Sequence, residues 1–107
     1  MKQETIKVEL LEDNKKDILR FHVDNDYDIN LDSSKSQEQL KRVFSILLEK
    51  LVQIDIELEL CVNNQYSKAL YKEVCSEYIN DLNKEIKKVR SELIVDYKDD
   101  LDLLIKH

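Results

Sequence analysis

Apolar and polar side chains alternate through the first third of the chain, a pattern typical of half-buried β-strands. Ile6, Val8 and Leu10 share one parity, whereas Lys7 and Glu9 share the other. The pattern predicts strands over residues 5–11, 19–23 and 27–31, with polar turns at 12–17 and 24–26. Because the alternation is unbroken from 18 to 31, a single bent strand over that range is the alternative.

The middle of the chain changes to helical spacing and then returns to alternation. Ser36 and Gln39 have the form of a capping box, which predicts that a helix begins here. Apolar side chains then recur at intervals of three and four, on one face of the predicted helix: Leu40, Val43, Phe44, Leu47, Leu48 and Leu51. From Ile54 to Val62 every second residue is apolar, which predicts another strand after a crossover connection.

Beyond Ser67 the helical spacing continues and predicts a long C-terminal helix over 67–105. Thirty residues of helix measure about 45 Å, whereas a compact domain of this length has a radius of gyration of about 13 Å. The helix therefore either projects from the sheet or breaks near 95–97 and folds back. A projecting apolar seam must be buried against another chain, so we expect a homodimer with paired helices, parallel or antiparallel. Its oligomer interface would consist of Tyr78, Leu82, Ile86, Val89 and Leu93.

These elements predict a single α+β domain over residues 1–107, with the chain order ββ(β)αβα. Two layers are expected: a sheet of three or four mainly antiparallel strands, one helix packed on it, and the long C-terminal helix. The chain contains no glycine and no proline. Phosphate-binding loops, dinucleotide fingerprints and nucleophile elbows all need glycine, so these motifs are excluded. Together with the single alanine, Ala69, this composition favours an AT-rich genome, such as that of a low-GC bacterium or a phage.

The chain is acidic, with a formal net charge of −6 and an isoelectric point near 4.9. This charge argues against direct binding to nucleic acid or to anionic membranes, which both favour a basic surface. We expect protein partners that are basic, nucleic-acid-binding proteins among them. The sequence shows neither the apolar segment of a signal peptide nor a membrane span, and Cys61 and Cys75 are too few for a secreted disulfide framework. We therefore expect a cytoplasmic protein with reduced thiols.

Two groups of residues resemble metal sites but each lacks a required feature. Residues 24–35 place oxygen atoms at alternate positions, as a calcium loop does, yet Ile29 stands where glycine is needed and Lys35 where a bidentate glutamate is needed. His22, His107 and the two cysteines lack the spacing of a zinc site. We expect no metal and no cofactor.

A row of three carboxylates, Asp55, Glu57 and Glu59, occupies one face of a predicted strand. Neighbours in this row stand about 7 Å apart, a spacing that acid–base catalysis can use. However, the sequence shows no apolar cleft that would raise a carboxyl pKa. We expect a polar surface that Lys7 and Arg20 can reach by cross-strand pairs, and no catalytic residue.

Two groups on the long helix are expected to be ordinary surface. Three tyrosines near its start should cap the core with their hydroxyls in water, and the alternative is that they are central residues of an interface: Tyr66, Tyr71 and Tyr78. Four cations should form a solvated basic face: Lys84, Lys87, Lys88 and Arg90.

The leading hypothesis is a non-enzymatic interaction protein that binds and regulates or inhibits another macromolecule, in the manner of a phage-encoded inhibitor or an antitoxin. Its partner-binding surface would be acidic: Asp24, Asp26, Asp28, Asp55, Glu57 and Glu59. The alternative is a structural subunit of a larger bacterial or phage assembly that docks through its C-terminal helix. A small metal-dependent hydrolase is a distant third.

Overall fold

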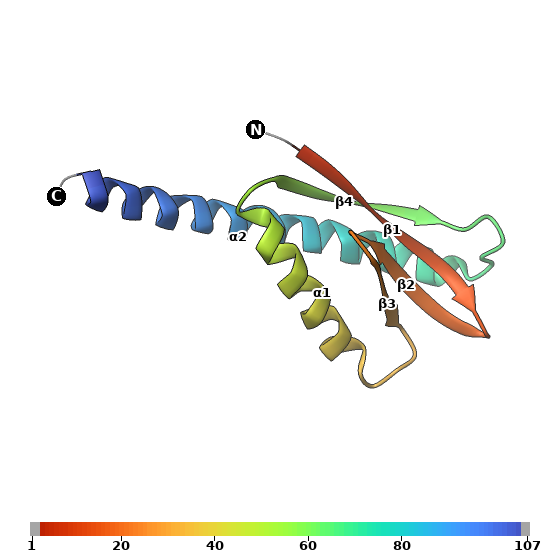
Figure 1. Ribbon diagram of the computed structural model, residues 1–107. Coiled ribbons are helices and arrows are strands. Elements are labelled where there is room, and N and C mark those ends of the chain that lie inside the picture. The colour runs from red at the N-terminus through yellow and green to blue at the C-terminus, as the bar shows by residue number, and fades with distance from the viewer. Residues whose placement is uncertain (1–2, 106–107) are drawn as a thin grey trace.

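The computed structural model describes residues 3–105, with the side chains of residues 3–93. Its elements follow in the order β1 (Gln3–Asp13), β2 (Lys16–His22), β3 (Asp26–Asn30), α1 (Ser36–Leu51), β4 (Asp55–Val62) and α2 (Ala69–Ile105). The α+β class predicted from the alternating and helical spacings is confirmed (Figure 1). The third strand is separate, so the alternative of one bent strand from 18 to 31 is wrong.

The four strands form one mixed sheet in the order β3-β2-β1-β4. β1 pairs antiparallel with β2, and β2 pairs antiparallel with β3. β4 returns to the opposite edge and pairs with β1 in parallel. The parallel pair requires a long connection, which α1 supplies between β3 and β4.

A tight turn without glycine joins β1 to β2. Asp13 and Lys16 are the last paired residues, which leaves Asn14 and Lys15 as a two-residue loop. Both loop residues have positive φ, 50° at Asn14 and 63° at Lys15, as a type I′ hairpin turn requires. Asparagine tolerates this conformation, whereas lysine adopts it at a cost of about 1–2 kcal/mol.

One face of the sheet packs against both helices and forms the core. Alternate residues of β1, β2, β3 and β4 supply the sheet side of this core: Ile6, Val8, Leu10, Leu19, Phe21, Ile29, Ile56 and Leu58. The helices supply the other side: Val43, Leu47, Leu51, Cys75, Ile79 and Ile86. The opposite face of the sheet is therefore left uncovered by the two helices.

The start of α1 differs from the prediction. The N-cap residue is Lys35, and no side chain caps the helix there, so the capping box at Ser36 and Gln39 is wrong. Gln39 instead uses its side-chain carbonyl to accept a hydrogen bond of 2.9 Å from the backbone N–H of Asn30. Because β3 is an edge strand, this bond satisfies a donor that no neighbouring strand can reach.

The second edge strand is held in the same way by α2. The side-chain amide of Asn83 accepts a hydrogen bond of 2.8 Å from the N–H of Leu58 and donates one of 2.9 Å to its carbonyl. The amide thus replaces a neighbouring strand at the middle of β4. Each edge strand is therefore hydrogen-bonded to the helix beside it, β3 to α1 and β4 to α2.

Arg90 of α2 closes the connection between α1 and β4. Its guanidinium donates hydrogen bonds to the carbonyls of Leu51 and Ile54, and it lies 3.8 Å from the Asp55 carboxylate. Arg90 is only 6% exposed, so its placement on a solvated basic face was wrong. A cation is favourable at this position because the carbonyls at the end of α1 lack helical partners.

The long helix starts at Ala69, two residues later than predicted, and continues to Ile105 as one helix. It runs past the end of the sheet toward the C-terminus (Figure 1). The molecule is therefore elongated, with extents of 60 × 25 × 22 Å and a radius of gyration of 16.5 Å. Of the two predicted outcomes, projection and a break near 95–97, the helix projects.

Candidate functional site

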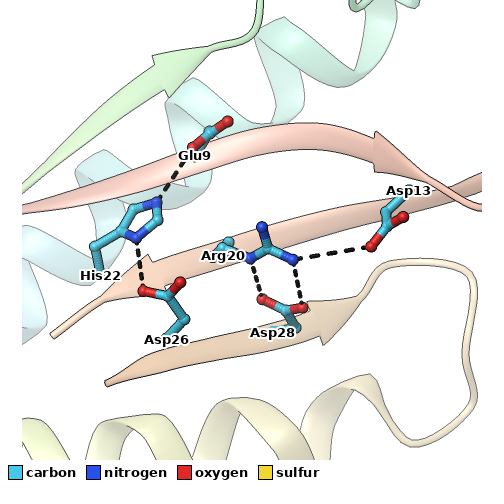
Figure 2. A network of polar contacts seen from close by, with 6 residues as sticks. All are labelled: Glu9, Asp13, Arg20, His22, Asp26 and Asp28. Carbon is cyan, nitrogen blue, oxygen red and sulfur yellow. Dashed lines mark hydrogen bonds and ion pairs between the residues drawn. The ribbon is translucent and has the colours of Figure 1, made fainter. Parts of the chain in front are cut away.

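The uncovered face of the sheet carries an excess of acidic side chains. Strand alternation brings seven carboxylates from β1, β3 and β4 to this outer face: Glu9, Asp13, Asp26, Asp28, Asp55, Glu57 and Glu59. The same alternation brings three cations to it: Lys7, Lys16 and Arg20. We call this surface the outer sheet face. Figure 2 shows its β1–β3 side.

Arg20 organises the acidic groups on one part of this surface. Its Nε and Nη2 donate hydrogen bonds of 2.7 and 3.0 Å to the two oxygens of Asp28, and Nη2 lies 3.9 Å from Asp13 (Figure 2). The hydrogen bond to Asp28 raises the pKa of Arg20. The bidentate geometry fixes the guanidinium across β2 and β3. The predicted contact between Arg20 and the carboxylates of β4 was wrong, because β1 separates the two strands.

His22 links three strands on the same surface. Its Nδ1 lies 2.8 Å from an Asp26 oxygen, and its Nε2 lies 3.2 Å from a Glu9 oxygen (Figure 2). The hydrogen bond to Asp26 raises the pKa of His22, partial burial lowers it, and the hydrogen bond to Glu9 raises it again, with a net rise. The arrangement favours the doubly protonated ring, because both nitrogens can then donate.

The carboxylates of β4 lie at the other edge of the outer sheet face. Glu57 and Glu59 are exposed, and Asp55 is half-buried beside Arg90. Glu57 accepts a long hydrogen bond of 3.4 Å from the side chain of Gln3. In contrast to Asp28, which Arg20 holds at both oxygens, Glu57 and Glu59 lie open to solvent at the sheet edge.

One predicted member of the acidic surface lies elsewhere. Asp24 is in the turn after β2 and accepts a hydrogen bond of 2.7 Å from Nζ of Lys50, which belongs to α1. This contact raises the pKa of Lys50. Asp24 therefore contacts the helix layer. Asp26 and Asp28 instead share the outer sheet face with the three carboxylates of β4, although they lie at opposite edges.

A buried polar cluster at the start of β2 was not predicted. Asp17, expected in an exposed turn, is 1% exposed and lies on the core side of the sheet. Its carboxylate accepts hydrogen bonds of 3.1 Å from the Tyr66 hydroxyl and 2.8 Å from Nζ of Lys68. Burial, followed by the hydrogen bond to Asp17, raises the pKa of Tyr66. The Tyr66 hydroxyl is thus bonded inside the protein, and the prediction that it reaches water was wrong.

The cluster continues through Asp32 to the first turn of α2. Asp32 accepts hydrogen bonds of 3.3 Å from the backbone N–H of Asp17 and 3.2 Å from the Tyr71 hydroxyl. Both oxygens of Asp17 are occupied by donors of the chain, so this carboxylate stabilises the connection from β4 to α2. Burial raises the pKa of the nearby Cys75 thiol, which makes it a poor nucleophile. The cluster therefore ties β2 and Asp32 to the residues that lead into and begin α2.

The five residues predicted for an oligomer interface lie in two environments. Ile86 is 0% exposed and belongs to the chain's own core, so it is not available to a second copy in this conformation. Val89 and Leu93 pack partly against the same core, as do Tyr78 and Leu82. Burial raises the pKa of Tyr78. The predicted homodimer itself is untested by a single chain.

Tyr78 and Leu82 also line an open groove between α1 and α2. One section, of about 470 Å³, lies between Leu40 and Phe44 of α1 and Leu82 of α2. The other section, of about 240 Å³, lies between the start of α1 and Val74 and Tyr78 of α2. Apolar side chains line most of both sections. We call these two sections the helix groove.

Comparison with known proteins finds no family model, no curated protein and no solved structure that matches this chain. Within residues 3–105, neither helix is long and apolar enough to cross a membrane. The described part of the chain also brings no three His, Cys, Asp or Glu side chains into a group that could hold a metal ion. The carboxylates of residues 24–32 instead contact cations and polar groups of the chain itself.

Proposed function

We propose that this protein is a non-enzymatic interaction protein that binds a basic region of another protein through its outer sheet face, and thereby regulates or inhibits that protein. The observation that carries the proposal is the one-sided sheet: both helices pack on one face, and the other face presents seven carboxylates from β1, β3 and β4. A surface of this charge attracts basic partners and repels nucleic acid.

The two edges of this face have different roles in the proposal. Arg20 and His22 hold Asp26 and Asp28 in fixed positions, so this part of the surface is rigid before a partner binds. Glu57 and Glu59 are exposed at the β4 edge and are the groups that a partner's lysine or arginine can reach. Charge pairs of this kind increase the association rate and the specificity more than the final affinity.

The test compares partner capture by three forms of the protein. Wild type, Glu57→Lys/Glu59→Lys and the control Glu49→Lys/Glu73→Lys are immobilised and exposed to the soluble proteins of the encoding organism. Both variants change the net charge by the same amount, but the control residues lie on α1 and α2. We expect wild type and control to retain the same partner, the outer-face variant to lose it, and retention to fall as salt increases.

All four altered residues are exposed, so the melting temperatures should stay within a few degrees of one another. Equal capture by all three forms would contradict the proposal, as would the absence of any retained protein. If only the control variant failed to retain the partner, the binding surface would lie on the helices instead of the outer sheet face.

The projecting end of α2 favours a second candidate, a structural subunit anchored in a larger assembly by residues 94–105. A shortened chain that ends at residue 93 distinguishes the two proposed functions. A subunit anchored by the helix loses its partner in this shortened form, whereas an interaction protein that uses the outer sheet face keeps it.

A further inference from the structure

The helix groove lies on the opposite side of the molecule from the outer sheet face and has a separate chemistry. α1 and α2 meet near the end of α1, where Arg90 binds the carbonyl of Leu51, and they diverge toward the start of α1 (Figure 1). The groove opens in this divergent region, along α2 from residue 71 to residue 85.

The α2 wall of the groove is an apolar ridge that the chain's own core does not fully cover. Leu70, Val74, Tyr78 and Leu82 follow one another at intervals of four, which places them in one ridge on the helix surface. Leu70 is 75% exposed and Val74 is 53% exposed. Tyr78 and Leu82 are half-buried, and both line the groove. An exposed apolar ridge beside a groove is typical of a docking site.

An acidic row runs beside this ridge. Glu77, Asp81 and Glu85 are exposed, also at intervals of four, and Glu85 lines the groove directly. On the α1 wall, Lys41 is the charged residue that lines the groove. The edge of the groove along α2 is therefore negative, while its interior is apolar.

We propose that the helix groove binds an amphipathic α-helix of another protein, with its apolar side in the groove and lysine or arginine residues along the edge that faces Glu77, Asp81 and Glu85. From residue 70 to residue 85 the ridge is about 22 Å long, which accommodates about four turns of a bound helix. Recognition of this kind uses apolar anchors at helical spacing, and the acidic row sets the charge of the partner.

Charge also argues against the chain's own C-terminal end as the occupant. Residues 94–105 contain four aspartates and one lysine. A second copy that placed this segment in the groove would bring its negative charge against the acidic row. A basic helix gains attraction at the same contacts.

The test uses two synthetic helical peptides as probes. Both carry leucines at helical spacing on one face; the first has lysines along the flanks, and the second has glutamates at the same positions. We expect the basic peptide to bind with a Kd of about 1–100 μM and the acidic peptide to bind at least about tenfold more weakly. Amide shifts in the NMR spectrum should change for residues of the groove, and much less for those of β1 and β2.

Two variants and a matched control locate the binding. Asp81→Lys/Glu85→Lys removes the acidic row, and Leu70→Ser/Val74→Ser removes the exposed part of the ridge. Because these side chains are exposed or lie at the surface, both variants should remain folded, which circular dichroism checks. We expect each variant to weaken binding of the basic peptide about tenfold or more. The control Glu57→Lys/Glu59→Lys makes the same change of charge as Asp81→Lys/Glu85→Lys but on the outer sheet face, and should weaken binding less than about threefold.

Several outcomes would overturn the proposal: no binding of either peptide, equal binding of the two, or unchanged binding by both groove variants. Light scattering can give one further outcome that would overturn it. If wild type is a dimer and Leu70→Ser/Val74→Ser makes it a folded monomer, the occupant is a second copy of this chain. Because the groove and the outer sheet face are altered by different residues, failure here leaves the test of the proposed function intact.

Discussion

His22 makes the stability of the outer sheet face dependent on pH. The hydrogen bonds that the ring makes to the carboxylates of Asp26 and Glu9 raise its pKa above the ordinary value of 6.5, against the opposing effect of partial burial. The folded form therefore binds a proton more tightly than the unfolded form. The resulting stabilisation is complete below about pH 6.5 and is lost as the pH rises through the folded pKa, because the neutral ring can donate to only one carboxylate.

We expect wild type to lose stability relative to His22→Gln between about pH 6 and pH 8, by less than about 1 kcal/mol because the site is open to solvent. Urea unfolding of both proteins at several pH values measures the difference. The variant Asp26→Asn removes the charged partner that raises the pKa of His22 most, and should reduce the dependence of stability on pH. A difference between wild type and His22→Gln that is constant over this range would show that the ring does not titrate in contact with these carboxylates.

Residues in the buried polar contacts were the hardest to predict from the sequence. Asp17 follows two lysines in a stretch that reads as an exposed turn, and its partners Tyr66 and Lys68 lie about fifty residues away. Arg90 was misplaced for a similar reason, because its acceptors are backbone carbonyls, which leave no mark in the side-chain pattern. The one available signal was parity: Asp17 shares the strand face of Leu19 and Phe21, the face that becomes the core.

Asn83 connects two elements, and its loss should loosen the contact between α2 and β4. The amide occupies both backbone groups of Leu58 on an edge strand. Asn83→Ala leaves these groups without their partner, which should cost about 1–3 kcal/mol of the free energy of unfolding. Hydrogen exchange at the Leu58 amide should become faster, since its acceptor is removed. The control Asn80→Ala, at an exposed position of the same helix, should change stability by less than about 0.5 kcal/mol.

Elements were predicted better than the contacts between them. The parity of Ile6, Val8 and Leu10 and the spacing of Leu40, Val43 and Leu47 fix the type of each element, because the faces they create must be buried. The same pattern carries no information on which strand lies at an edge. The ties made by Gln39 and Asn83 depend on this order, since both amides bind backbone groups of edge strands. If Asn83→Ala were as stable as wild type, the two hydrogen bonds to Leu58 would contribute little to holding α2 against β4.

At the scale of the whole molecule, the burial of Ile86 shows that the predicted seam belongs to the folded body. Ile86 is fully buried, Arg90 is 6% exposed, and Leu93 packs partly against the same core. The seam that predicted paired helices therefore packs, wholly or partly, against the core of its own chain. A change such as Ile86→Ala should cost about 2–5 kcal/mol and should not act as a selective disruptor of self-association.

Removal of residues 94–107 should, in contrast, leave the body folded. The end of α2 runs past the sheet (Figure 1), so the loss of residues 94–107 should change the free energy of unfolding by about 1 kcal/mol or less. The radius of gyration should fall from 16.5 Å toward about 12 Å, the value for a compact chain of the remaining length, which small-angle scattering measures. Light scattering on both forms also tests the predicted homodimer: a wild-type dimer that becomes a folded monomer places self-association in the removed segment. A shortened chain that fails to fold would instead show that this segment completes the core, and the projecting helix would then have no separate role.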